Sequence, residues 1–250
     1  DVNTSSLNLV TYNTSSFGAG IRFTVPLSEK NSISYGLTLD NTEVSNLAVD
    51  RSPRRYISYC SSVTNTTNST GCTMNSLTAN IGWAIDSRDD ILFPRKGELR
   101  RANAEVSTPG LDIQIYKITL QESWYKDLSK DLTIMLNGQF GYANSYGGKE
   151  FPFFKNFYLG GVNTVRGYRQ GSIGPVCVQG DASCGLSTST TNMFVGGNKQ
   201  VLANAELFMP VPFVKNNDQF RLSAFIDAGN VYGHDESINL STIRYSAGMG

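Results

Sequence analysis

Two acidic residues and one arginine have the types and spacing to form a buried ionic site. Glu206 lies in a run that alternates apolar and polar residues, and Asp227 lies in the next such run. Successive side chains of a β-strand point to opposite faces, so both carboxylates fall on the polar face of neighbouring antiparallel strands. Two carboxylates on one wall need a cation. Arg166 is expected to supply it, because its planar guanidinium can bridge both acids.

Arg166 belongs to the motif Val165-Arg166-Gly167-Tyr168, within a long segment of about residues 144–197 that shows no regular period. An isolated loop arginine is usually solvated, but this one follows a stretch too aromatic for an exposed loop. Long structureless loops in compact proteins are uncommon and usually functional. We therefore predict that residues 151–175 fold inward, with a packing set of Phe153, Phe154, Phe157, Tyr158, Gly160 and Gly161.

The four cysteines form two local pairs, each in a polar segment. We predict the disulfides Cys60–Cys72 and Cys177–Cys184, which would staple loops in an oxidising compartment. Free thiols or another pairing stay open as alternatives. Metal binding is not expected, because neither spacing resembles a paired C-x-x-C zinc site and His234 is the only histidine.

Enzymatic activity is not expected either, and no cofactor is predicted. His234 stands in Gly233-His-Asp-Glu236, but no nucleophilic serine in a strained Gly-x-Ser-x-Gly turn accompanies it. An exposed loop histidine is the simpler interpretation. The net charge of zero gives no argument for a nucleic-acid partner.

The elements that would carry these side chains are strands. Segments with period two, each with one apolar face, predict about ten strands and no helix of any length. The turns alternate short and long: residues 27–31, 87–97, 123–130 and 210–218 are short, whereas 45–73, 144–197 and 232–240 are longer. We expect residues 45–73 to be an exposed loop. The predicted strands cover about 7–12, 17–25, 33–39, 77–85, 102–106, 116–120, 132–142, 201–209, 220–228 and 243–249.

This pattern is typical of an antiparallel transmembrane β-barrel. Such barrels show about ten alternating residues per strand, short turns at one end and long extracellular loops at the other. No run of about 18 apolar residues offers a transmembrane helix. Charged residues make up only 17% of the chain and aromatic residues 11%, which suits many strands joined by turns. A soluble sandwich would not follow the alternating rule for turn length.

Several motifs resemble the BamA family of outer-membrane protein assembly factors. Residues 147–158, Gly160-Gly161, Val165–Tyr168 and Ile173-Gly-Pro175 are similar to that family's long inner loop. Phe225-Ile-Asp-Ala-Gly229 resembles its inner-wall motif, and Asp86-Ser-Arg-Asp with Phe93-Pro and Gly97 resembles its periplasmic turn. In that family the loop arginine is held by acidic residues of the adjacent wall, which here fall on Glu206 and Asp227.

The resemblance implies a sixteen-stranded barrel in the bacterial outer membrane, preceded by POTRA domains. Residues 1–250 would be the central part of that barrel domain, without the POTRA domains, the first strands and the last two strands. The implied function is to insert and fold other barrel proteins. The implied partners are the lipid bilayer, unfolded barrel clients and accessory assembly lipoproteins. The rival functions are a two-partner secretion pore or a TamA-type barrel, and a passive porin.

Overall fold

The structure is a computed structural model that describes residues 2–3, 12–47, 52–67, 69–178, 184, 193–211 and 221–250. A ten-stranded antiparallel sheet forms nearly all of it. The strand order runs β1-β2-β3-β4-β5-β6-β7-β10-β11-β12, so neighbours in the chain are also neighbours in the sheet. This is the meander expected when consecutive alternating segments are joined by hairpins. The predicted all-β fold and the expected strand number are confirmed.

The strands are long and the helices few. The sheet consists of β1 (Val2–Asn3), β2 (Asn13–Ser28), β3 (Asn31–Ser45), β4 (Cys72–Asp86), β5 (Gly97–Ser107), β6 (Ile115–Asp127), β7 (Thr133–Ser145), β10 (Lys199–Pro210), β11 (Arg221–Tyr232) and β12 (Arg244–Met249). Outside it lie the hairpin of β8 (Val176–Cys177) and β9 (Met193–Phe194), the helix α1 (Arg54–Thr64), and the 3-10 turns η1 (Phe153–Lys155) and η2 (Leu240–Thr242). The uncertain strand predicted near 7–12 lies almost wholly outside the described residues, as does most of the turn predicted at 210–218.

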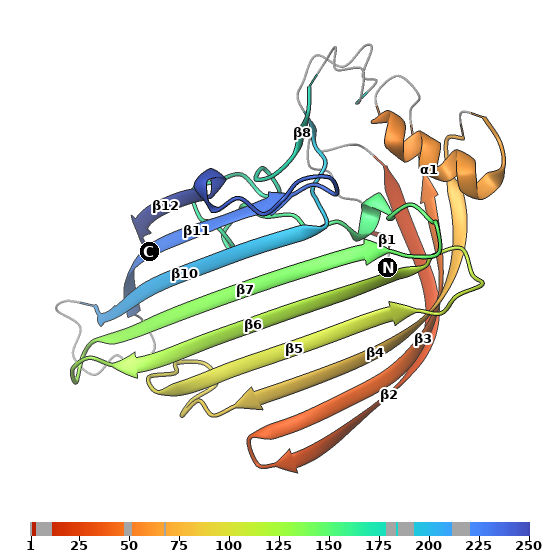
Figure 1. The fold of residues 1–250 in the computed structure, drawn as a ribbon. Helices are drawn as coiled ribbons and strands as arrows, with labels where there is room; N and C mark the ends of the chain where they lie inside the picture. The colour runs from red at the N-terminus through yellow and green to blue at the C-terminus, as the bar shows by residue number, and fades with distance from the viewer. Residues whose placement is uncertain are drawn as a thin grey trace.

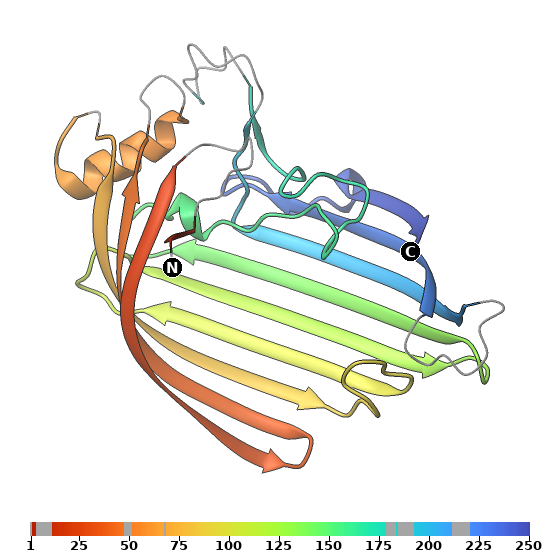
Figure 2. The ribbon, with the colours of Figure 1, turned by 180° about the vertical axis from the view of Figure 1, so that it is seen from behind.

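The sheet curves into a trough, and the long segment before β10 lies against its concave side (Figures 1 and 2). The turns after β2, β4 and β6 lie at one end, which we call the short-turn end. Helix α1 and the β8–β9 hairpin lie at the opposite, long-loop end. The alternation of turn lengths in the sequence therefore corresponds to two different ends of the sheet.

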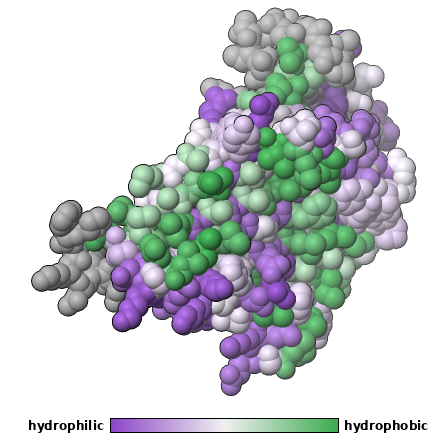
Figure 3. Space-filling model, turned by 60° about the vertical axis from the view of Figure 1, so that its left-hand side comes forward, coloured by the Kyte–Doolittle hydropathy of each residue, from purple (hydrophilic) through white to green (hydrophobic). Residues whose placement is uncertain are grey.

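The convex face of the sheet is apolar and exposed, as the period-two pattern predicts for a lipid-facing surface. The side chains of Phe17 and Ile21 on β2 are 82% and 65% exposed, and Ile226 on β11 is 61% exposed. Figure 3 shows broad hydrophobic areas across the middle of the molecule and hydrophilic side chains gathered along its lower edge. Among the described residues, no helix combines the length and apolarity needed to span a membrane.

The prediction of an exposed, helix-free loop at residues 45–73 was wrong. Residues Arg54–Thr64 form α1, which buries Tyr56, Tyr59 and Cys60. The Tyr56 ring stacks on Phe153 with ring centroids 3.9 Å apart, and the Tyr56 hydroxyl donates to the Val195 carbonyl at 3.2 Å. Burial raises the pKa of Tyr56 well above its ordinary value, so this hydroxyl stays protonated. Tertiary packing has therefore created a helix where the local sequence shows little propensity.

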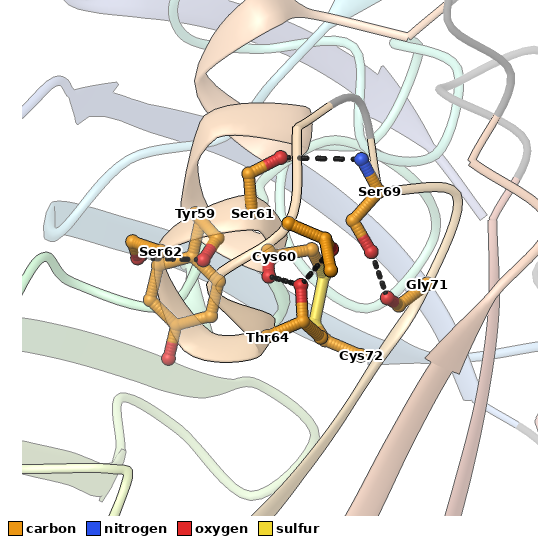
Figure 4. Close-up of a disulfide and its surroundings, with 9 residues drawn as sticks. Tyr59, Cys60, Ser61, Ser62, Thr64, Ser69, Gly71 and Cys72 are labelled. Atoms are coloured by element: carbon orange, nitrogen blue, oxygen red, sulfur yellow. Dashed lines mark hydrogen bonds between the residues drawn. A yellow bond between two sulfur atoms is a disulfide. The ribbon is translucent and has the colours of Figure 1, made fainter.

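Both predicted disulfides are present, and both lie at the long-loop end. Cys60 of α1 is joined to Cys72 at the start of β4, with Cα atoms 5.1 Å apart. Cys177 is joined to Cys184, with Cα atoms 5.5 Å apart. Figure 4 shows the first bridge, where the Thr64 hydroxyl donates to the Cys60 carbonyl and the Ser69 amide donates to the Ser61 hydroxyl. The Cys60–Cys72 bridge thus ties α1 directly to the sheet.

Candidate functional site

The inner loop, residues 146–175, is held against the concave wall by a hydrophobic cluster. Phe157, Leu159, Val165 and Ile173 are buried against Leu202 of β10, Val231 of β11 and Ala143 of β7. Short β-bridges, Phe157 with Gly197 and Leu159 with Ile173, replace regular secondary structure. These bridges pair backbone groups of Phe157, Leu159 and Ile173 where the loop is buried, which lowers the cost of burying an irregular segment.

The predicted aromatic packing set divides between two places. Phe157 packs on the wall, and the Lys117 ammonium of β6 lies 4.3 Å from its ring centroid. Phe153 and Phe154 instead pack with α1 at the long-loop end, in a cluster that contains both disulfides. The Tyr158 hydroxyl donates to the Val195 carbonyl at 3.2 Å. Phe153 is buried and Phe154 is half-buried, both against a helix that the sequence analysis did not anticipate.

Seven glycines of the loop have positive φ, and three of them shape the turn that carries Arg166. Gly160 and Gly161 have φ of 108° and 101°, and a Cβ on Gly160 would lie 2.5 Å from the Arg169 carbonyl oxygen. Gly167, directly after Arg166, has φ of 84°. Residues that carry a side chain rarely adopt positive φ, so these positions need glycine for the chain to turn back on itself. The turn brings Arg166 to face the sheet.

Arg166, Glu206 and Asp227 meet on the concave wall. The Arg166 guanidinium donates from Nε to Asp227 Oδ2 at 2.7 Å and from Nη2 to Asp227 Oδ1 at 2.8 Å, a two-pronged pair. Its Nη1 donates to Glu206 Oε1 at 2.9 Å. The Arg166 amide also donates to Asp227 Oδ2, at 3.0 Å. A lysine could not make this set of hydrogen bonds, because its ammonium lacks the planar arrangement of donors of a guanidinium.

The strands position the two acids diagonally. β10 and β11 pair so that Glu206 lies opposite Phe225 and Asn204 lies opposite Asp227. The Asp227 side chain is fully buried and that of Glu206 is 12% exposed, whereas that of Arg166 is 22% exposed. Charges this sheltered from water interact more strongly than a surface pair, but each depends on its partner for solvation. The site therefore acts as a docking point for the loop.

Several residues of the site were missed by sequence reasoning. The Phe225 ring lies beneath the guanidinium, 3.6 Å from Arg166 Cζ to the ring centroid. Asn204 Nδ2 donates to Asp227 Oδ1 and to the Thr164 carbonyl, both at 2.8 Å. Asn137 Nδ2 in turn donates to Asn204 Oδ1 at 2.8 Å. The available signal was register: Asn137, Asn204 and Asp227 lie directly opposite one another across three strands.

Next to the ionic site is a polar hollow of about 270 Å³. Gln121, Tyr125 and Gln139 are among the side chains that line it, with Arg166 and Glu206 at one side. Such a hollow keeps water near the ion pair and so lowers the free-energy cost of burying it.

His234, in contrast, lies at the long-loop end, where its Nδ1 is 3.3 Å from Asn198 Nδ2.

A curved antiparallel sheet with an apolar outer face, and a loop docked on its inner face, defines an outer-membrane barrel segment with an internal plug. The chain matches the Omp85 superfamily domain over residues 2–250 and therefore belongs to that superfamily. The protein is located in the bacterial outer membrane, as predicted.

Three relatives illustrate the likeness. The chain is 35% identical to the outer membrane protein assembly factor BamA of Neisseria meningitidis, over 93% of this chain and 28% of that protein. It is 30% identical to the sorting and assembly machinery component 50 homolog of Xenopus tropicalis, over 66% of this chain and 36% of that protein. A crystal structure of Haemophilus ducreyi BamA lacking POTRA domains 1–3 superimposes with a TM-score of 0.84 at 25% identity, covering 99% of this chain and 50% of that one. The chain thus spans half or less of each relative.

Proposed function

We propose that this chain is the central barrel segment of an outer-membrane insertase, which folds and inserts other β-barrel proteins. The observation that carries the proposal is the docking of Arg166 on Glu206 and Asp227 within an Omp85 chain. A loop fixed in the lumen by a buried ion pair would obstruct a passive pore. An assembly factor, in contrast, requires a barrel of defined shape.

The mechanism we infer is mechanical and makes or breaks no covalent bond. The loop joins the inner wall at β10 and β11 to the long-loop end, so it sets the curvature of the sheet between them. The short-turn end would face the periplasm, and clients would arrive there as unfolded chains. The proposed partners are therefore the bilayer, unfolded barrel clients and accessory assembly lipoproteins. The proposed arrangement of the whole protein places POTRA domains before this segment.

The test is a depletion experiment. Cells are depleted of the wild-type full-length protein while they produce a variant of it as the only copy. Arg166→Ala should reduce the folded amounts of several unrelated outer-membrane barrels at once, because the shape of the insertase would be altered. Arg169→Ala changes an exposed arginine of the same loop and is the matched control. Normal levels of all client barrels in cells that depend on the Arg166→Ala protein would refute the proposal.

The second candidate is a two-partner secretion pore or a TamA-type barrel, since loops of that kind carry similar Val-Arg-Gly-Tyr motifs. The same experiment separates the candidates. Loss of one secreted substrate, with client barrels unchanged, would favour the secretion pore. A general loss of barrels would favour the insertase.

A further inference from the structure

The turn between β4 and β5, residues 87–96, folds across the short-turn end instead of extending away from it. Figure 2 shows it curled in front of the start of β5, on the concave side. Arg95 Nε donates to Asp127 Oδ1 at the end of β6, at 3.0 Å. On its other side, the turn is contacted by Arg221, the first residue of β11. Three strands, β6, β7 and β10, lie between β5 and β11 in the sheet. The turn therefore bridges the trough.

The contact with β11 is made by a guanidinium on two successive carbonyls. Arg221 Nη2 donates to the Phe93 carbonyl at 3.1 Å and Nη1 donates to the Pro94 carbonyl at 3.3 Å. The Arg221 Cζ also lies 5.4 Å from the Phe93 ring centroid. A guanidinium can serve both carbonyls because its donors diverge in one plane, whereas an ammonium on a flexible stem is not preorganised to do so. Pro94 is buried beneath this contact.

The turn is preorganised for this role by two carboxylates. Asp89 Oδ1 accepts hydrogen bonds from the amides of Asp90, Arg95 and Lys96, at 3.1, 2.9 and 3.1 Å. Asp90 Oδ1 accepts from the amides of Leu92 and Phe93, at 2.7 and 2.8 Å. Burial alone would raise the pKa of Asp89, but the amide donors outweigh it and hold that pKa below its ordinary value. The two carboxylates thus hold the turn in one shape through hydrogen bonds within the turn itself.

Arg221 shares a face of β11 with the residues that hold the inner loop. Arg221, Phe225 and Asp227 are separated by even numbers of residues, so all three point to the concave side. Asp227 holds Arg166 of the inner loop, and Arg221 holds the β4–β5 turn. Six residues of antiparallel strand correspond to about 20 Å, so the two contacts act at different depths of the trough.

We infer that Arg221 is a positioning residue that fixes the β4–β5 turn across the short-turn mouth as a second, independent plug. The inner loop closes the lumen from the long-loop side, and the turn narrows it at the other end. This inference does not depend on insertase activity. It concerns the shape and permeability of the barrel itself.

The test uses the full-length protein in lipid vesicles and a single reporter thiol, Pro94→Cys. The chain's own cysteines are paired in disulfides, so the reporter is the thiol of this segment that a maleimide would label. Labelling should be at least tenfold faster when Arg221→Gln is added, because the buried position opens. Arg22→Gln, which changes an exposed arginine on the inward face of β2, should leave the rate unchanged.

Channel recording distinguishes a moved plug from a merely weakened barrel. Arg221→Gln should raise the single-channel conductance per folded barrel several-fold, whereas loss of stability alone would lower the number of folded barrels without changing each one. If Arg221→Gln does not fold, Arg221→Lys takes its place and should give an intermediate labelling rate. Equal labelling rates with and without the Arg221 change, or fast labelling already in the Pro94→Cys parent, would overturn the inference.

Discussion

Replacement of Arg166 by alanine is the most direct test of the docking site. The change removes three side-chain hydrogen bonds to carboxylates, two to Asp227 and one to Glu206. It also leaves two acids, placed diagonally on adjacent strands, without the cation that they share. We therefore expect the folded barrel to lose stability and the loop to detach from the wall.

The magnitude follows from burial. Removing one partner of a buried ion pair costs about 3–5 kcal/mol, because the remaining charge is left unsolvated. Asp227 would keep the amide donor of Asn204, and the adjoining hollow lets water reach Glu206. These two effects reduce the expected loss in the free energy of unfolding to about 2–3 kcal/mol.

The assay is a urea titration of the full-length protein in detergent, read as the heat-modifiable shift on a gel. Arg169→Ala should stay within about 0.5 kcal/mol of the wild type, as a surface change does. Arg166→Lys should fall between wild type and alanine. The double variant Arg166→Ala with Asp227→Asn should cost less than the sum of the singles, because no unpaired aspartate charge remains. A titration midpoint unchanged by Arg166→Ala, or strictly additive costs, would refute the reasoning.

Three further changes test the surroundings of the site. Asn204→Ala should lower the free energy of unfolding by about 1–2 kcal/mol, because Asp227 loses a hydrogen-bond donor. Urea titration measures this loss, and Gln139→Ala in the same hollow is the control. Cys60→Ser should speed amide hydrogen exchange in α1, because the bridge restricts the unfolded chain around the helix. The two cysteines are separated by 12 residues, and a disulfide that closes a loop of about that length stabilises the folded state by about 3 kcal/mol if its effect is entropic. Cys177→Ser, with a separation of 7 residues, should leave heat-modifiable mobility unchanged, and loss of all folding would contradict this.

Strand phase made the ionic site predictable. Period two assigns each residue of a strand to a face, so Glu206 and Asp227 could be placed on the inner wall from the sequence alone. Arg166 followed because a buried pair of acids requires a cation. Asn204 and Asn137 were not foreseen as part of the site, because their roles depend on which residues lie opposite each other across three strands. Register between strands distant in sequence is not fixed by the pattern of a single strand.

Helix α1 shows the opposite case. Its segment is rich in serine, tyrosine and β-branched residues, which are mediocre helix formers. A weak signal was nevertheless present: Tyr56, Tyr59, Cys60 and Val63 follow the spacing i, i+3, i+4, i+7 of a helical apolar face. Asn65 ends the helix in the left-handed conformation, with φ of 54°. The helix forms because Phe153 offers an aromatic surface to that face, and no local pattern contains this information.

The contacts made by β11 also help to specify its register. Arg221 and Asp227 point inward, while Ile226 on the same strand points to the lipid side and is 61% exposed. A slip of one residue against β10 would reverse every side chain of the strand. It would place an arginine on the lipid face, which costs about 2–4 kcal/mol at the membrane midplane and less towards the interface. It would also break the contacts to the inner loop and to the β4–β5 turn together. The side chains of β11 that hold the inner loop and the β4–β5 turn therefore also disfavour a shifted register between β11 and β10.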